Sequence, residues 1–559
     1  MTMMRDEVMD QLTGAGGPHE IAEVDIRGTA TRVFVNAPAS LVDTLRRSRE
    51  YGDRTFVVYE DDSWTFAEHF DIVAKLADRL VNELGVAKGD RVAIAMRNFP
   101  EWIAAFWATA AAGGIAVPLN AWWTGSELEY ALADSGAMVL IADEERALRL
   151  EPHLAATAVE VRIVARGDVE GWLPFDEVIA ASSATELPEV ALDPDDDATI
   201  FYTSGTTGVP KGAVGTHRNI CTITANGDFG VARAAAFTGK ELLHFTERPQ
   251  MGRLLSVPLF HVTGCHATMV GSTWAGSKLV MMYRWNPERA LELIERERLT
   301  SFGGVPSMVW EVLESPTFDQ HDLSSVQSIG YGGAPAPPEL VRRIGESFTL
   351  AAPGNGYGLT ETSSVAIANG GADYVRKPHS IGRPLTVVDI RIVDPAGDDV
   401  ALGEVGELLI KGPNVVRGYW NKPEETASTF VDGWLHTGDL ATIDDEGFVT
   451  IADRAKDVVI RGGENIYCAE VEGVLYEHPA ITEACVLGVA HRILGEELGA
   501  VLVLRPGKEA TAEEIQAHVR ERLAGFKVPT HIWFRDEPLP RNPAGKVLKR
   551  ELRDELSAG

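Results

Sequence analysis

The sequence is poor in cysteine, and this excludes two classes of protein. Its four cysteines, Cys221, Cys265, Cys468 and Cys485, are spread over 559 residues and form no CxxC pair. Secreted domains held by disulfides and zinc-binding modules both need cysteines at close, regular spacing. The sequence therefore predicts free thiols in a reducing compartment, and we expect a cytoplasmic protein.

Positive charge is also scarce. The chain has 51 lysines and arginines against 82 aspartates and glutamates, which gives a net charge of −31 at pH 7, and it has no long basic run. Nucleic-acid binding depends on clustered lysine and arginine. We therefore expect no nucleic-acid partner.

The chain lacks an unbroken hydrophobic run. The stretch WIAAFWATAAAGGIAVPL (102–119) has about the length that a bilayer needs, but Gly113 and Gly114 divide it and Pro118 ends it. The acidic start, MTMMRDEVMD, has no apolar core of a signal peptide. We expect a buried helix and strand here, and no integral membrane segment.

The order of helical and strand patterns predicts an α/β fold. Behind a lead-in segment (1–40), apolar spacing indicates a helix over 65–84, and further helices and strands alternate with it. They cover 91–96, 101–112, 114–119, 137–142, 278–283, 287–299 and 300–305. Such alternation is typical of layered α/β subdomains with largely parallel sheets.

The predicted secondary structure changes after about residue 380. Strand patterns at 387–394, 406–412 and 447–453 have few helices between them and predict a β-rich subdomain. A boundary near Asp453 divides the chain into a large N-terminal domain (41–452) and a small α+β C-terminal domain (453–559). In the latter, Thr511 and Glu514 form a capping box that predicts a helix start.

The first chemical motif is YTSGTTGVPKG (202–212), which follows the apolar run ATIF (198–201). Its glycines let several N–H groups point at one anion, its hydroxyls add donors and its lysine adds charge. The residues concerned are Thr203, Ser204, Gly205, Thr206, Thr207, Gly208 and Lys211. A Walker loop is excluded, because two residues separate Gly208 from Lys211. The alternative is an ordinary solvent loop.

A second glycine-rich motif, GNGYGLTET (354–362), has Leu359 where a dinucleotide fingerprint has its third glycine. It is either a plain turn or a second nucleotide loop. In the second case Tyr357 stacks on a base and Glu361 holds Mg²⁺ through a carboxylate oxygen.

Four weaker signals each have an ordinary alternative. In GWLHTGDL (433–440), Asp439 bridges two ribose hydroxyls or is a surface acid. The segment 331–340 (YGGAPAPPEL) is a close-approaching loop or a strand-to-helix turn. In PLFHVTGCH, His261 is a site candidate while His266 is interpreted as a core residue. Lys546, in PRNPAGKVLKREL, is catalytic or solvated.

Taken together and in this order, these motifs resemble the adenylate-forming (acyl-activating) superfamily, most closely bacterial fatty acyl-CoA synthetases. The resemblance runs from about residue 40 to 550. It implies an AMP-forming acid–thiol ligase that uses ATP, Mg²⁺ and coenzyme A on a small-molecule carboxylic acid. Acyl-AMP is the intermediate, and the C-terminal domain is mobile.

The resemblance also assigns roles to individual residues. Residues 202–212 would grip the phosphates, Thr203 and Glu361 would bind Mg²⁺, and Thr360 would meet the α-phosphate. Asp439 and Arg454 would bind the ribose. The adenine would lie among Gly333, Ala334, Pro335, Asn355, Gly356, Tyr357 and Gly358. Asn355 stands where many relatives have glutamine.

Two half-reactions are implied. Lys546 would assist adenylation, and the small domain would then swing about Lys456. The swing would bring the RGGEN loop (461–465), with Arg461, Gly462 and Gly463, to the site, where its glycines leave room for a pantetheine arm.

The sequence leaves open to which chemical class the acyl group belongs. By resemblance the pocket wall includes His261, Thr263, Ser307 and the stretch after Thr362. These residues are small or polar, which permits a chain, a ring or a fused ring system. The segments LNAWWTGSELEYAL and RGGENIYCAEVE resemble bacterial fatty acyl-CoA synthetases, and this resemblance favours a medium- or long-chain fatty acid over an aromatic acid or a steroid side-chain acid. A long chain would suggest loose contact with membranes. The oligomeric state is left open.

Three other readings compete with a CoA ligase. An amino-acid adenylation domain is disfavoured because PLFHVTG contains no acid. A luciferase-like oxygenase would share every motif, and an inactive nucleotide-binding scaffold would have lost Lys546 or Glu361.

Overall fold

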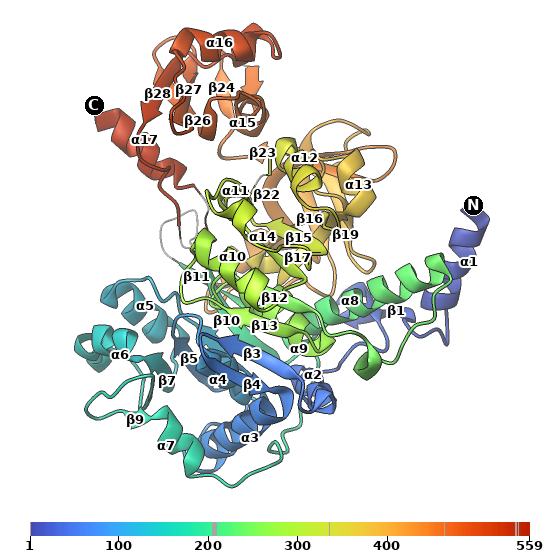
Figure 1. Ribbon diagram of the computed structural model, residues 1–559, viewed down its shortest axis with the longest axis vertical. Helices are drawn as coiled ribbons and strands as arrows, with labels where there is room; N and C mark the ends of the chain where they lie inside the picture. The colour runs from blue at the N-terminus through green and yellow to red at the C-terminus, as the bar shows by residue number, and fades with distance from the viewer. Residues whose placement is uncertain are drawn as a thin grey trace.

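The computed structural model describes residues 2–203, 210–334, 336–462, 464–542, 545 and 547–558. These form a large unit and a small C-terminal unit, which is red and orange in Figure 1. The large unit contains two mixed α/β sheets and one antiparallel sheet. This confirms the predicted α/β fold class, with a large N-terminal domain and a small C-terminal one.

The first sheet of the large unit has seven strands in the order β11-β10-β6-β5-β7-β8-β9, parallel except for the antiparallel pair β10–β11. Its strands are β5 (Arg91–Ala95), β6 (Ile115–Pro118), β7 (Val139–Asp143), β8 (Val161–Ala165), β9 (Leu173–Pro174), β10 (Asp197–Thr203) and β11 (Lys211–Thr216). The accompanying helices are α3 (Phe66–Asn82), α4 (Pro100–Ala111), α5 (Gly125–Ser135), α6 (Glu144–Leu150), α7 (Phe175–Ala180) and α8 (His217–Thr238).

The second sheet has nine strands in the order β18-β17-β16-β15-β14-β12-β13-β3-β4. They are β3 (Thr55–Tyr59), β4 (Asp62–Thr65), β12 (Gly252–Leu255), β13 (Lys278–Met281), β14 (Ser301–Gly304), β15 (Ser328–Gly332), β16 (Ala352–Leu359), β17 (Ser364–Gly370) and β18 (Arg383–Pro384). The associated helices are α2 (Leu41–Ser48), α9 (Gly271–Ala275), α10 (Pro287–Arg296), α11 (Pro306–Leu313), α12 (Pro338–Ser347) and α13 (Gly371–Arg376).

Local sequence accounts for the helices on which these sheets pack. Thr65 and Glu68 form a reciprocal capping box at the start of α3, which satisfies two otherwise free N–H groups. Helix α4, from the membrane-like run, is buried along almost its whole length, so its apolar surface serves the core. Among the described residues, no helix is long and apolar enough to cross a membrane.

The third sheet is antiparallel, in the order β19-β20-β22-β21, with β23 paired to β22. It contains β19 (Asp389–Val393), β20 (Gly406–Lys411), β21 (Phe430–Val431), β22 (Trp434–Ile443) and β23 (Val449–Arg454), with helix α14 (Pro423–Thr429) beside it. This is the β-rich subdomain that the sequence predicts.

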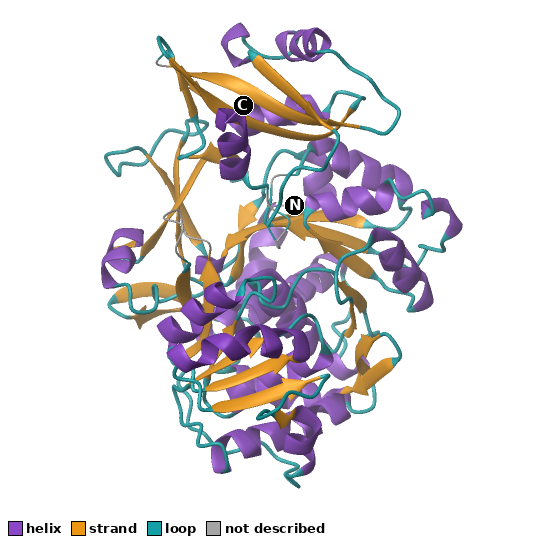
Figure 2. Cartoon of the chain, turned by 90° about the vertical axis from the view of Figure 1, so that its left-hand side faces the viewer, coloured by secondary structure: helices purple, strands orange, loops and turns teal. Residues whose placement is uncertain are grey.

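The small unit has its own sheet, in the order β25-β24-β27-β26, with β28 paired to β27. Figure 2 shows this sheet at the top of the molecule with helices beside it. Its elements are β24 (Val459–Arg461), β25 (Glu464–Ile466), α15 (Cys468–Tyr476), β26 (Ile481–His491), β27 (Gly495–Leu504), α16 (Ala512–Arg520), β28 (His531–Arg535) and α17 (Lys549–Ala558). The chain passes from one sheet to the next between Arg454 and Val459, and the boundary near Asp453 stays a prediction.

The expected lead-in carries structure of its own. Helix α1 (Thr2–Thr13) is followed by the hairpin β1 (Ile21–Ile26) and β2 (Thr29–Phe34). Phe34 at the end of the hairpin packs against Phe229 of α8, with ring centroids 5.7 Å apart. The hairpin thus contributes to a small core cluster on the large unit.

Candidate active site

A cleft of about 2080 Å³ is lined by residues of both units, and we call it the interdomain cleft. It receives side chains from the ends of β10, β15, β16, β22 and β23. The predicted site residues that line it are Thr203, Lys211, His261, Gly333, Ala334, Asn355, Gly356, Tyr357, Gly358, Thr360, Glu361, Asp439, Arg454 and Lys456. Residues from six separate segments of the sequence therefore meet at one place.

Other predicted residues are not placed at this cleft. Ser204, Gly205, Thr206, Thr207, Gly208, Pro335, Gly463 and Lys546 lie outside the described residues. Arg461 and Gly462 are described, but they are not among the residues that line the cleft. Arg461 instead faces Glu497 of β27, with a nitrogen–oxygen separation of 3.6 Å.

The phosphate motif is anchored on both sides. Thr203, the last residue of β10, is paired across the sheet with Lys211, the first of β11. The hydroxyl of Tyr202 donates to Asp134 Oδ2 at 2.7 Å, and burial together with that carboxylate raises the pKa of Tyr202 well above its usual range. The two strands therefore fix the entry and the exit of the motif at the cleft.

The second glycine-rich motif is a strand rather than a loop or turn. Ala352–Leu359 is β16, which pairs with β15 and β17, and only Thr360–Thr362 forms a short helical turn. A Cβ added to Gly358 would lie 1.5 Å from the carbonyl oxygen of Ser364, and one added to Gly332 would lie 2.2 Å from that of Gly356. The glycines thus permit neighbouring backbones to approach closely.

Glu361 follows this strand and is held by a residue that the sequence did not single out. The hydroxyl of Tyr419 donates to Glu361 Oε1 at 2.7 Å, and Lys211 Nζ lies 5.2 Å from the centroid of the Tyr419 ring. Burial, followed by the charge of Glu361, raises the pKa of Tyr419, so this tyrosine stays protonated and can donate. Thr203 and Glu361 offer oxygen ligands of the kind that Mg²⁺ prefers.

Metal binding here would not be by a protein cage. Across the ranges that the structure describes, no group of three or more histidine, cysteine, aspartate or glutamate side chains could hold an ion. Mg²⁺ usually takes only one or two carboxylates together with substrate phosphates. The donors at Thr203 and Glu361 therefore fit Mg²⁺ that arrives with a nucleotide.

Asp439 also lines the cleft and is almost fully buried. Tyr357 donates its hydroxyl to Asp439 Oδ2 at 2.5 Å, and Arg454 Nε lies 2.9 Å from Oδ1. Asp439 and Arg454 are directly opposed on β22 and β23. Burial and the neighbouring carboxylate raise the pKa of Tyr357, so Tyr357 orients Asp439 in addition to facing the cleft.

The imidazole of His261 belongs to the cleft wall. Its Nε2 atom is buried and has no hydrogen-bond partner among the described residues. Burial lowers its pKa to about 4, so the ring is neutral at physiological pH. His266, interpreted from the sequence as a core residue, is buried, with Nδ1 3.1 Å from the carbonyl oxygen of Ser363.

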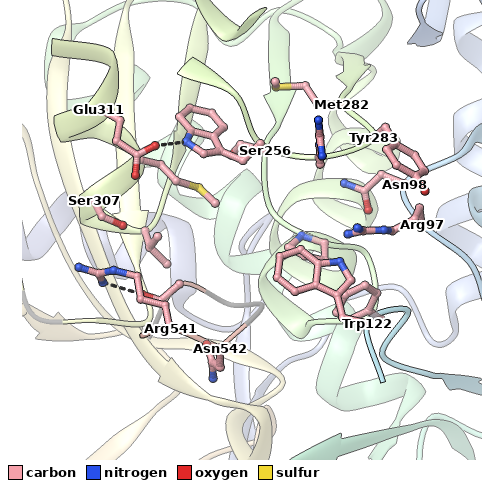
Figure 3. A pocket seen from close by; sticks show the side chains of 17 residues that line it. Arg97, Asn98, Trp122, Ser256, Met282, Tyr283, Ser307, Glu311, Arg541 and Asn542 are labelled. Atoms are coloured by element: carbon pink, nitrogen blue, oxygen red, sulfur yellow. Dashed lines mark hydrogen bonds between the residues drawn. The ribbon is translucent and has the colours of Figure 1, made fainter. Parts of the chain in front are cut away.

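The segment that flanks Lys546 packs on the large unit. Asn542 and Gly545 line a second pocket of about 460 Å³, together with Ser307 and Glu311 of α11 (Figure 3). Arg541 donates to the carbonyl oxygen of Gly545 at 2.8 Å, and a Cβ added to Gly545 would lie 2.6 Å from Val305 Cγ2. Gly545 is therefore packed against Val305, the residue that follows β14.

Two family models cover most of the chain. The model described as "AMP-binding enzyme" matches residues 45–420, and that of the "AMP-binding enzyme C-terminal domain" matches residues 470–546. The chain belongs to the AMP-binding enzyme family. As a member of this family it is an AMP-forming acid–CoA ligase, and ATP and CoA are substrates of such ligases.

Named relatives of this AMP-binding enzyme act on different acids. It is 36% identical over 513 residues to a feruloyl-CoA synthase of Amycolatopsis sp, which covers 91% of this chain and 97% of that relative. It is also 36% identical over 550 residues to a long-chain-fatty-acid–CoA ligase of Bacillus subtilis (strain 168), with 92% and 93% covered. Both resemble it over nearly their full lengths.

The fold matches a solved AMP-binding enzyme as well. The anthranilate CoA ligase AuaEII, in complex with anthranoyl-AMP, superposes with a TM-score of 0.85 at 28% identity, covering 93% of this chain and 98% of that chain. The relatives thus agree on the reaction class and differ in the acyl group.

Proposed function

We propose that the enzyme activates its carboxylic acid at the interdomain cleft in two steps. ATP first converts the acid to acyl-AMP with release of pyrophosphate, and the thiol of CoA then displaces AMP. The observation that carries the proposal is that Asn542 and Val547, which flank Lys546 in the sequence, line the interdomain cleft while Gly545 packs against Val305 of the large unit. This arrangement supports an enzyme poised for the adenylation step.

The charges around the cleft suit that step. Bringing a carboxylate to a triphosphate joins two anions, so cationic groups at the phosphates lower the barrier. Lys211 and Lys546 would supply this charge, and Thr360 would donate to the α-phosphate. Mg²⁺ held by Thr203 and Glu361 would supply further neutralisation and orient the phosphates.

The nucleoside would lie between β15, β16 and β22. Asp439, oriented by Tyr357 and Arg454, is a hydrogen-bond acceptor for two ribose hydroxyls. The bare backbone at Gly333 and Gly356 leaves room for the adenine plane, and Asn355 is the polar side chain next to it. Binding energy from these groups positions the α-phosphate.

Two candidate acyl groups have support. A medium- or long-chain fatty acid is favoured by the motifs and by the similarity to long-chain-fatty-acid–CoA ligases. An aromatic or other oxygen-bearing acid is favoured by the similarity to feruloyl-CoA synthase. A cationic side chain, Arg253, in the wall of the cleft also favours the second candidate. An alkyl chain offers such a group nothing to bind.

The test is pyrophosphate release with ATP and Mg²⁺ across a panel of fatty, aromatic and dicarboxylic acids, with and without CoA. Sustained release with one acid class only when CoA is present is the expected result. A single burst of pyrophosphate that does not depend on CoA would mean that the enzyme forms acyl-AMP but transfers the acyl group to an acceptor other than CoA. No release with any acid would refute the proposed function.

A further inference from the structure

Among the described residues, one arginine in the wall of the interdomain cleft is only partly exposed and has no counterion. Arg253 is the second residue of β12, in the otherwise apolar segment GRLLSVPLF. No hydrogen bond or ion pair joins it to any described residue, and burial alone lowers the pKa of its guanidinium. Withdrawing a charge partly from water without a counterion is costly, so its presence calls for an explanation.

The position of Arg253 on the sheet directs it into the cleft. Its neighbour Leu254 packs with α10–α12 on one face of the nine-stranded sheet, whereas Leu255 packs with the helical segment Thr263–Val270 on the other. Successive strand residues point to opposite faces. Arg253 therefore shares the face of Leu255, and it is recorded among the residues that line the interdomain cleft.

This part of the cleft, which we call the acyl cavity, lies between β12, β14, β15 and the segment Thr263–Val270. Its wall is formed by Arg253, His261, Thr263, Ala267, Thr268, Ser301, Gly303 and Gly330. Gly330 is exposed although it belongs to a central strand, and a Cβ added to it would meet no atom within 4 Å. No side chain therefore covers the sheet at Gly330, and a ligand has room to reach Arg253.

The polar end of the acyl cavity lies away from the reaction end. Arg253 is opposite Ser301 in the parallel pair β12–β14, so a guanidinium and a hydroxyl stand side by side. Gly304, at the end of β14, lies three residues further on, and at about 3.3 Å per residue this separates the two levels by roughly 10 Å. An acid that reacts near Gly304 would extend its far end toward Arg253.

We propose that Arg253 is a specificity-determining residue that binds an oxygen at the distal end of the acid, either a second carboxylate or a phenolic oxygen. This inference rests on the proposed function, because it names the substrate class of the same cavity. A guanidinium binds a carboxylate with two parallel hydrogen bonds, which would compensate the charge that the protein leaves unpaired. A site built to bind a substrate oxygen also rejects analogues that lack it.

The experiment compares matched pairs of acids on the full-length enzyme. The pairs are decanedioic with decanoic acid and 4-hydroxycinnamic with cinnamic acid, so a carboxylate and a phenolic oxygen are tested separately. We expect kcat/KM to be higher for the oxygen-bearing member of at least one pair, on the order of ten- to a hundredfold. In Arg253→Met this ratio should fall to about one or invert, whereas Arg253→Lys should keep part of it.

Controls separate this inference from general damage and from failure of the proposed function. Arg46→Met removes an exposed arginine from α2, whose side chain is 55% accessible, and should leave the ratios unchanged. An equal loss for both members of each pair in Arg253→Met, or equal ratios in the wild type, would overturn the inference. If no acid releases pyrophosphate, the same pairs are compared by thermal shift. A shift by the oxygen-bearing acid that Arg253→Met abolishes would support the binding role, and equal shifts would refute it.

Discussion

The hydroxyl of Tyr419 donates to Glu361 Oε1 at 2.7 Å, although 58 residues separate the two in sequence. Glu361 is the carboxylate proposed to hold Mg²⁺ with Thr203. A donor on one oxygen fixes the orientation of the carboxylate and leaves the other oxygen for the metal. If Glu361 holds Mg²⁺ as proposed, Tyr419 is a positioning residue for it.

This relationship gives the first prediction. Glu361→Gln should lower kcat/KM for adenylation by about a hundredfold or more, because a neutral amide binds Mg²⁺ poorly. Tyr419→Phe should mainly raise the Mg²⁺ concentration needed for half-maximal rate, by roughly ten- to a hundredfold, as for other residues that orient a metal ligand. Titration of pyrophosphate release with Mg²⁺ measures both effects. If Tyr419→Phe lowered kcat with no change in Mg²⁺ dependence, the positioning role would be wrong.

The second prediction concerns Lys546, whose neighbour Gly545 packs against Val305. Lys546→Ala should abolish formation of acyl-AMP, because the charge at the α-phosphate is lost. The same variant should still convert supplied acyl-AMP and CoA to thioester, since the lysine would be withdrawn in that step. The two half-reactions are assayed separately, and equal loss of both would contradict the assignment.

A third prediction tests whether the small unit moves about Lys456. In the present arrangement Arg505 of the small unit pairs with Glu314 at the end of α11, and its guanidinium lies 5.8 Å from the Trp310 ring centroid. A partly exposed pair of this kind contributes only up to about 1 kcal/mol, so it can open during turnover.

Proline at the hinge would restrict backbone rotation there. Lys456→Pro should therefore spare adenylation and block thioester formation, as measured by burst release of pyrophosphate without acyl-CoA. Normal overall turnover in this variant would refute the hinge assignment. Lys456→Ala is the control, because it removes the same side chain without the restriction that proline imposes on the backbone, and it should not separate the two half-reactions.

The fourth prediction is loss of stability in acid. Burial lowers the pKa of His69 to about 3 and those of His217, His261 and His266 to about 4, from an ordinary value of 6.5. Between pH 6.5 and 4 the unfolded chain therefore binds more protons than the folded one. As the pH is lowered through this window, the free energy of unfolding should decrease, by up to about 1.4 kcal/mol per pH unit for each histidine.

Thermal unfolding between pH 7.5 and 4.5 measures this slope. His69 is fully buried and packs edge-on against Phe56, away from the cleft, so His69→Leu should make the slope shallower by the share of one histidine. An unchanged slope in that variant would show that His69 does not contribute to the acid sensitivity.

Short-range features could be predicted from the sequence. The capping box at Thr511 with Glu514 is present as predicted, because it depends on residues three positions apart. The capping box at Thr65 with Glu68 was not predicted, although it has the same spacing. The order of the motifs was enough for the enzyme family, since that order is carried by the chain itself.

Other features depended on which strands become neighbours. The glycines of 352–359 suggested a loop, but they form a strand because β15 and β17 approach its backbone closely. Nothing in the sequence indicated that Tyr419 would contact Glu361. Arg253 was a single charged residue in an apolar strand, and no role was predicted for it.

The sequence by itself determined the reaction class and the helix start at Thr511, and it pointed to part of the residues that line the cleft. Only the tertiary structure decided that Tyr419 holds Glu361, that Tyr357 holds Asp439 and that Arg253 faces the acyl cavity. Capping and motif chemistry act over a few residues, whereas strand order and the burial of a charge are set by contacts between residues far apart in the chain.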